Sequence, residues 1–254
     1  MKITVLGSGT SQGIPVIACD CEVCLSADMR DNRLRCSILI EHNGENHVID
    51  TGPDFRQQML RANVQSLRSV IFTHEHKDHI AGLDDVRAFN FKEDRDMEIF
   101  CTPEVEEALR REYHYAFAES SYPGIPQLNI NSIGLEPFLL PDGLQLIPIE
   151  VMHYKMAVLG FRIHDFAYVT DAKTVEDSEI EKLKGVKVLI VNALRKEPHL
   201  SHFNLDEALD FIQKVGPESA YLTHISHLFG THEQIELELP PHVHVAFDGL
   251  QFEF

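Results

Sequence analysis

One stretch of six residues concentrates groups that can bind metal ions. His74, His76, Asp78 and His79 lie within it and directly follow the apolar run of residues 69–73. At a strand end, residues two apart face the same side, so His74 and His76 can reach one ion. After the chain turns, Asp78 and His79 point to a second position nearby. Imidazoles and a carboxylate suit zinc, manganese or iron, and two such ions side by side form a hydrolytic centre.

A centre with two ions needs more ligands than this stretch supplies. His153, Asp171 and His224 each follow a short β-branched run, so each is predicted to stand at the end of a strand. An aspartate at such a place can bridge two cations through its two oxygens, while each histidine completes one coordination sphere. We therefore predict a dinuclear metal site built from these residues and the histidine motif.

The cysteines predict a second, separate metal site. Cys19, Cys21 and Cys24 lie within six residues, and the total of five cysteines is odd. With no secretory context, this pattern favours metal binding over disulfides. Three thiolates suit a structural zinc ion that lacks one ligand. We predict that His227 is the fourth ligand, because it lies three residues after His224 and one short segment could then serve both sites.

Charge and composition limit the partners. The 254 residues include 22 basic and 40 acidic side chains, a formal net charge of −18. Proteins that bind nucleic-acid backbones usually present a basic face, so the charge argues against a nucleic-acid partner. The first seven residues are too short an apolar run for a signal peptide, and no apolar run approaches the ~20 residues of a membrane-spanning helix. We expect a cytoplasmic protein with no membrane partner.

The elements that must position these ligands form a layered α/β pattern. Short β-branched runs recur throughout the chain, and helical periodicity is clearest at residues 204–215, where Asn204 is the expected N-cap and Gly216-Pro217 the stop. No linker divides the chain, which we interpret as one domain over residues 1–254. Residues 113–136 break the rhythm and are interpreted as a long loop, an insertion that could act as a lid.

At these residues the chain resembles the metallo-β-lactamase superfamily, and more closely its PhnP-type phosphodiesterases, which hydrolyse cyclic phosphates. The resemblance covers nearly the whole chain. It is carried by the histidine motif and by Gly7–Pro15, Cys19/Cys21/Cys24, Asp50-Thr51-Gly52, His153-Tyr154-Lys155, Thr170-Asp171, Thr223–His227 and Phe247-Asp248-Gly249. The stretch 113–136, which looks longer and more aromatic than in PhnP, and the residues Leu194 and Phe203 depart from the family pattern.

The resemblance implies a four-layer αββα sandwich with the site at one edge. It assigns His74, His76 and His153 to one metal, and Asp78, His79 and His224 to the other, with Asp171 as the bridge. It also places His227 with the three cysteines on zinc. It further suggests that His202 reaches the substrate or its leaving group. Asp50, at the end of a strand, is expected to support the ligands through hydrogen bonds.

The expected chemistry is hydrolysis of a small phosphodiester, with a cyclic, sugar-linked one among the candidates. Asp78 would orient the nucleophile and His202 would supply a proton to the leaving group. The active-site ions could be manganese, zinc or iron, and a homodimer is one option for the assembly. Alternatives on the same centre are a nuclease of the tRNase Z kind and a thioester or lactam hydrolase. A metal-bearing carrier such as PqqB is the alternative from a different class.

Overall fold

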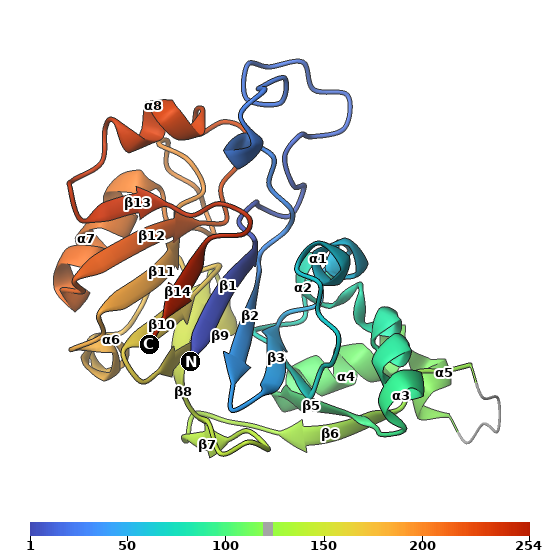
Figure 1. Cartoon of the computed structure of the whole chain (residues 1–254). Helices are drawn as coiled ribbons and strands as arrows, with labels where there is room; N and C mark the ends of the chain where they lie inside the picture. Colours follow the sequence, from blue (N-terminus) through green and yellow to red (C-terminus); the bar gives the residue numbers. More distant parts are fainter. Residues whose placement is uncertain (119–123) are drawn as a thin grey trace.

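Two β-sheets form the centre of the fold in this computed structural model, which describes residues 1–118 and 124–254 (Figure 1). The first sheet has the strand order β14-β1-β2-β3-β4-β5-β6. Its strands are β1 (Lys2–Gly7), β2 (Ser37–His42), β3 (Glu45–Ile49), β4 (Ser69–Ile71), β5 (Met97–Cys101), β6 (Leu128–Ser132) and β14 (Gln251–Glu253). Strands β3 to β6 run parallel to one another, so their carboxyl ends meet at one edge.

The second sheet has the order β13-β12-β11-β10-β9-β8-β7. Its strands are β7 (Phe138–Leu139), β8 (Gln145–His153), β9 (Met156–Ile163), β10 (Phe166–Val169), β11 (Val188–Asn192), β12 (Ser219–Thr223) and β13 (Val243–Val245). Strands β8 and β9 form a long hairpin, whereas β10 to β13 run parallel. The carboxyl ends of β10 and β12 therefore also lie at one edge.

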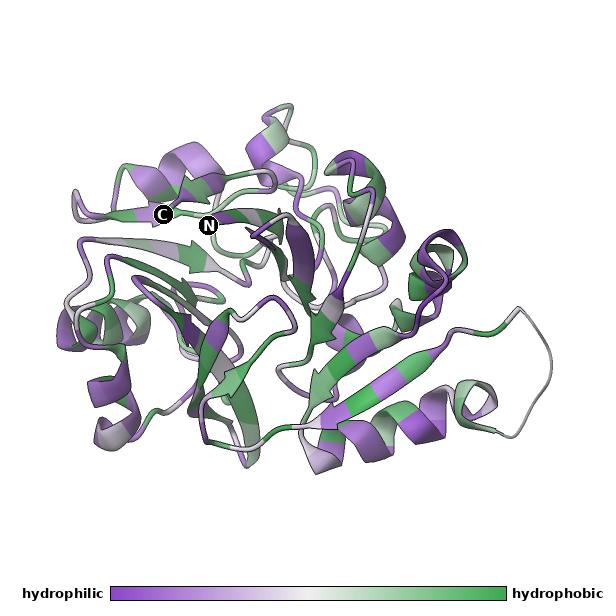
Figure 2. Cartoon of the chain, turned by 60° about the horizontal axis from the view of Figure 1, so that its bottom comes forward, coloured by the Kyte–Doolittle hydropathy of each residue, from purple (hydrophilic) through white to green (hydrophobic). Residues whose placement is uncertain are grey.

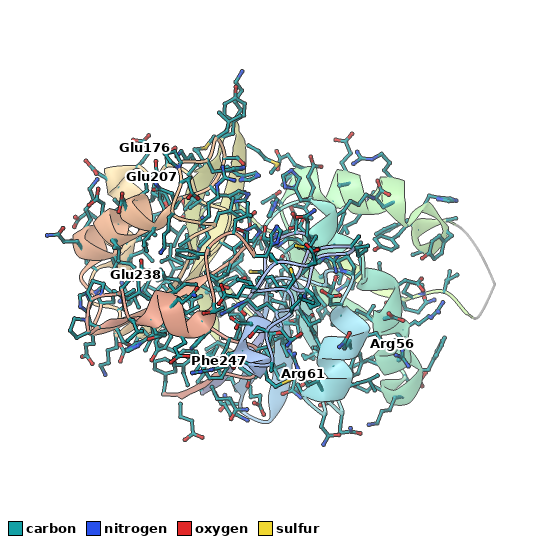
Figure 3. All side chains as sticks on the ribbon, turned by 90° about the horizontal axis from the view of Figure 1, so that it is seen from above. Arg56, Arg61, Glu176, Glu207, Glu238 and Phe247 are labelled. Atoms are coloured by element: carbon teal, nitrogen blue, oxygen red, sulfur yellow. The ribbon has the colours of Figure 1, made fainter. Side chains whose placement is uncertain are left out.

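Helices cover the outer face of each sheet. Those on the side of the first sheet are α1 (Phe55–Arg61), α2 (Lys77–Ile80), the 3-10 helix η2 (Leu83–Val86), α3 (Arg87–Glu93), α4 (Pro103–Glu112) and α5 (His114–Phe117). The second sheet is covered by α6 (Asp177–Leu183), α7 (Leu205–Val215) and α8 (His232–Glu236), and the 3-10 helix η1 (Met29–Asp31) lies in the N-terminal loop. Seen from above, Glu176 and Glu207 lie on the side of α6 and α7, and Arg56 lies on the opposite side (Figure 3).

The alternation of side chains along the strands explains these four layers. In β2, Ile38 and Ile40 face the apolar core between the sheets, while Leu39 faces the helices α1 and α3. A matching outer core holds α6 and α7 against β11 and β12. Hydrophobic residues accordingly concentrate on the strands and on the inner faces of the helices (Figure 2). The predicted αββα sandwich is confirmed.

The clearest predicted helix is confirmed as α7. Asn204 accepts a hydrogen bond from the backbone N–H of Glu207, whose side chain accepts one in return from the N–H of Asn204. The helix ends at Gly216, whose φ of 72° is the left-handed conformation that glycine adopts without strain. None of the helices in the described residues is both long and apolar enough to cross a membrane.

The interpretation of residues 113–136 as a long loop is wrong for two short segments. Residues 114–117 form α5, and residues 128–132 form β6, the edge strand of the first sheet. Leu128 and Ile130 are partly buried against the apolar core, whereas Asn129 and Asn131 donate to Glu98 on β5. This alternation is the pattern of a strand with one apolar face. Residues 119–123 of the proposed lid lie outside the described residues.

Candidate metal centre

The histidine motif occupies the sharp turn between β4 and α2. His76 is in an extended conformation at the N-cap of α2, and Asp78 and His79 lie in that short helix. Two glycines let this turn pack closely against the end of β3. A Cβ on Gly52 would lie 2.1 Å from the carbonyl oxygen of Asp78, and one on Gly82 would lie 2.1 Å from that of Gly52. Glycine at these two positions therefore fixes where the Asp78 and His79 side chains begin.

The second sheet brings the remaining predicted ligands to the same place. His153 is the last residue of β8, Asp171 follows β10, and His224 follows β12. Asp171 and His224 have φ angles of 58° and 56°, and Asp50 at the end of β3 has 65°. Such left-handed conformations cost non-glycine residues on the order of 1–3 kcal/mol and concentrate at functional sites. Here they turn each side chain from its strand into the space between the sheets.

Asp171 contacts imidazoles from both sheets. Its Oδ2 lies 3.3 Å from Nε2 of His79, and its Oδ1 lies 3.3 Å from Nε2 of His224. Asp78 faces the same two rings, with Oδ2 3.3 Å from Nε2 of His79 and 3.8 Å from Nε2 of His224. Ligand atoms of Asp78, His79 and His224 lie within 4.8 Å of one another, as do those of His74, His79 and Asp171.

The other three predicted ligands lie beside this group. The ring centroids of His74 and His76 are 4.7 Å apart, those of His76 and His153 are 5.1 Å apart, and those of His74 and His153 are 6.0 Å apart. His153 and Asp171 also form a close group with His202. The fold thus gathers all seven predicted ligands, and Asp171 lies close to His79 and His224 of one predicted half and to His74 and His153 of the other.

Hydrogen bonds at Nδ1 hold three of the imidazoles with Nε2 directed inward. Nδ1 of His79 donates to Oδ2 of Asp50 at 2.7 Å, which is the supporting role expected for Asp50. Nδ1 of His153 donates to the carbonyl oxygen of Ser201 at 2.8 Å. Nδ1 of His74 lies 2.9 Å from Oγ1 of Thr73, which itself donates to Asp50. Each bond places the proton on Nδ1 and leaves Nε2 with a free lone pair.

Buried nitrogens without partners show that this donor set fits metal ions. Among the described residues, Nε2 of His74, His79 and His224 is buried and has no hydrogen-bond partner. The 3.3 Å contacts of His79 and His224 with Asp171 lack hydrogen-bond geometry. A buried polar atom left unpaired costs about 1–3 kcal/mol, so three of them in one place need an explanation. Imidazole nitrogens and carboxylates converging in this way are the ligands of zinc, manganese or iron.

The charges of the site favour a cation. Burial tends to raise the pKa of Asp171, but the imidazoles of His224 and His79 outweigh it and hold that pKa well below the usual range. Burial tends to lower the pKa of His79, yet the carboxylates of Asp50, Asp171 and Asp78 raise it well above its usual range. The carboxylates of Asp171 and Asp78, whose pKa values are lowered, thus remain ionised, and the negative field that draws a proton to His79 would equally draw a divalent ion.

His202 reaches the same cluster. Its ring centroid lies 4.5 Å from that of His153 and 4.7 Å from that of His224, and its Nδ1 lies 3.6 Å from Oδ1 of Asp171. Burial, and then the neighbouring His224, lower the pKa of His202 to about 2. A neutral His202 can offer a leaving oxygen an N–H hydrogen bond, but not a full positive charge.

The sequence analysis missed His199. Its ring stacks on that of His202 with centroids 5.1 Å apart, which extends the row of histidines away from the cluster. It stands three residues before His202, and that spacing could have drawn attention to it. The spacing alone, however, did not distinguish His199 from the other histidines.

The second predicted site is also assembled. Nδ1 of His227 lies 3.2 Å from Sγ of Cys19, 3.5 Å from that of Cys21 and 3.6 Å from that of Cys24. A tetrahedral zinc with bonds of about 2.3 Å to sulfur and about 2.0 Å to nitrogen separates such atoms by about 3.5 Å. The pKa of the Cys21 thiol is lowered to about 6, chiefly by a hydrogen bond from the backbone N–H of Cys24. Burial raises the pKa of the Cys24 thiol to about 11. The four residues therefore fit a structural zinc ion.

Comparisons with known proteins agree with this arrangement. Residues 45–225 match the family described as Beta-lactamase superfamily domain. A solved structure described as a new diphosphatase from the PhnP family is 37% identical, with a TM-score of 0.93 over 100% of this chain and 96% of that one. Zinc-bound PqqB from Methylobacterium extorquens has a TM-score of 0.80 at 18% identity, over the full length of both chains, which shows a shared fold.

A curated relative is much longer than this chain. The octanoyltransferase of Porphyromonas gingivalis is 39% identical over 99% of the chain. The chain spans only 51% of that protein's length, so the name describes a protein about twice as large.

Replacing Asp50 with asparagine should weaken metal binding at His79. The carboxylate accepts from the backbone and hydroxyl of Thr73 as well as from His79, and an amide would turn one of its acceptors into a donor. We expect the affinity for Mn²⁺ or Zn²⁺ to fall about 10- to 100-fold in calorimetric titrations. The matched control is Asp142→Asn, a buried aspartate that accepts from His42 and contacts His47 away from the site. Equal affinities in Asp50→Asn and wild type would contradict the supporting role.

Replacing Cys21 with serine should remove one tightly held zinc ion. Elemental analysis after dialysis should show one zinc fewer per chain than in the wild type. The unfolding midpoint should fall by roughly 5 °C or more, because the binding energy of a structural zinc stabilises the fold. Cys101→Ala is the control, since Cys101 is fully buried in the core between the first sheet and its covering helices. Zinc retained by Cys21→Ser, or lost equally from Cys101→Ala, would exclude the proposed site.

Proposed function

The chain belongs to the metallo-β-lactamase superfamily, and from that premise we propose that it is a dinuclear metal-dependent phosphodiesterase acting on a small phosphodiester. The observation that carries the proposal is the place of Asp171, which lies in one close group with His74 and His79 and in another with His153, so that it adjoins ligands assigned to both ions. The similarity to a structure described as a diphosphatase from the PhnP family, 37% identical over the whole chain, supports a reaction at a phosphate group.

In this proposal His74, His76 and His153 would hold one ion, Asp78, His79 and His224 would hold the other, and Asp171 would contact both. Such ions, manganese, zinc or iron, supply Lewis acidity and lower the pKa of water towards neutrality. Asp78 is partly open to the site, with 14% of its side chain exposed, so it can accept a hydrogen bond from the attacking water and orient it. His202, beside His153 and His224, would donate an N–H to the leaving oxygen.

A small substrate suits this protein better than a polymer. The net charge of −18 opposes the approach of a long polyanion, which argues against a nuclease of the tRNase Z kind. Cys19, Cys21 and Cys24 form no disulfide, which suits a reducing compartment, and we propose the cytoplasm. A carrier like PqqB is the less favoured alternative, because a carrier has no need of the complete ligand set gathered here.

The similarity to an octanoyltransferase raises a second reaction class for testing, namely attack on an acyl group. An octanoyltransferase handles an acyl group, and the same kind of centre could attack the carbonyl of a thioester. Since the chain matches only 51% of that relative, the resemblance does not favour acyl chemistry over phosphodiester hydrolysis.

The protein should hydrolyse bis(p-nitrophenyl) phosphate, and added Mn²⁺ should stimulate the reaction. Replacing Asp78 with alanine should lower kcat/KM at least about 100-fold, because it removes both a metal ligand and the group that orients water. Asp96→Ala, at an exposed position before β5, is the control and should keep wild-type activity. Unchanged turnover in Asp78→Ala would eliminate its role, and cleavage of thioesters or lactams without any phosphodiester would replace the proposed reaction.

A further inference from the structure

A cavity of about 520 Å³ lies directly beside the candidate metal centre. Thr73, His74 and Glu75 line one part of it. Because β4, β5 and β6 are parallel neighbours, the residues that follow β5 and β6 line the same edge of the sheet as His74. Another part of the wall is the start of β9, which follows the hairpin turn after His153. The cavity therefore continues from the predicted ligands along the sheet edge.

Most of the wall away from the histidines is apolar. Val105 and Ile133 come from beyond the ends of β5 and β6, and Met156 and Leu159 from β9. Val105, Ile133 and Leu159 are themselves buried. A hollow of this volume with apolar walls and a few polar groups at one end has the size and character of a small-molecule site. Burying an alkyl group there would be favourable by the hydrophobic effect.

The charged groups around the cavity are all acidic. Glu75, Glu104 and Glu150 line it, and the residues that line it include no lysine or arginine among the part of the chain that the structure describes. These carboxylates would repel a second phosphate or a carboxylate on the substrate. An uncharged group meets no such penalty.

We propose that this cavity binds an uncharged, apolar alkyl or aryl arm of the substrate while the phosphodiester lies at the histidine cluster. This inference rests on the proposed function for the orientation of the substrate. The anionic phosphate must lie at the metal ligands if the arm is to enter the cavity beside His74. It narrows the substrate class to phosphodiesters with one apolar arm, and it disfavours substrates that carry a further anionic group.

The first test compares 4-nitrophenyl alkyl phosphates with arms from methyl to hexyl. All of them release the same 4-nitrophenolate, so differences in kcat/KM report the alkyl arm. Wild-type protein should gain about three- to fourfold for each methylene that enters the cavity. A diester whose arm ends in a carboxylate should be cleaved no faster than the methyl diester. A flat alkyl series, or equal rates for the carboxylate-bearing diester and its neutral analogue, would overturn the proposal.

The variant Ala157→Phe should remove this preference. Ala157 lies on the cavity wall but is exposed on β9, so a phenyl group can fill the space without entering the core. Cleavage of the methyl diester should persist while the gain with chain length disappears. Ala88→Phe makes the same exchange at an exposed position of α3, on the outer side of the first sheet, and should retain the wild-type series. A chain-length gain unchanged in Ala157→Phe would place the arm elsewhere.

A binding experiment separates this proposal from the proposed function. Alkylphosphonates are not hydrolysed, and their affinity for the metal-loaded protein can be measured by calorimetry. If no diester is cleaved but phosphonate affinity rises about threefold per methylene in wild type and not in Ala157→Phe, the cavity assignment holds and the phosphodiesterase proposal fails. If diesters are cleaved but neither kcat/KM nor phosphonate affinity changes with chain length, the phosphodiesterase proposal holds and the cavity assignment fails. Phosphonates that fail to bind at any chain length would overturn the cavity assignment.

Discussion

The ionised carboxylate of Asp171, buried between imidazoles from both sheets, is the interaction on which the site depends. His79 reaches it from the turn after β4 and His224 from the end of β12, each at 3.3 Å. An anion with this little solvent is stable only among donors or cations. Both sheets therefore contribute to its surroundings, and the close approach at Gly52 and Gly82 sets where the turn that carries Asp78 and His79 lies against the end of β3.

The cysteine site is tied mechanically to the same edge. Ile225 lies between the metal-centre residue His224 and the cysteine-site residue His227. Its N–H donates to Ser8 and its carbonyl accepts from Thr10, both at 3.0 Å, so this segment is held against the N-terminal loop. A zinc ion held by Cys19, Cys21, Cys24 and His227 would fix the far end of the same segment. One short stretch of chain thus couples a structural site to a hydrolytic one.

Where chemistry and periodicity pointed the same way, the structure brings together the residues that the sequence singled out. The dense histidine motif, the cysteine spacing and the capped helix at residues 204–215 can each be recognised within a short stretch of sequence. Sequence reasoning failed at β6, because a run of only five residues with alternating asparagines resembles a loop until its neighbour β5 is known. It also missed His199, and it could not foresee the cavity beside His74, because stacking and cavities arise between segments distant in sequence.

The most direct test is anomalous X-ray diffraction from crystals of the protein loaded with manganese and zinc. The account predicts two anomalous peaks about 3.5–4 Å apart, one on each side of Asp171, and a third among Cys19, Cys21, Cys24 and His227. A single peak within the histidine cluster of the loaded protein, or an Asp171 carboxylate that contacts neither ion, would contradict it.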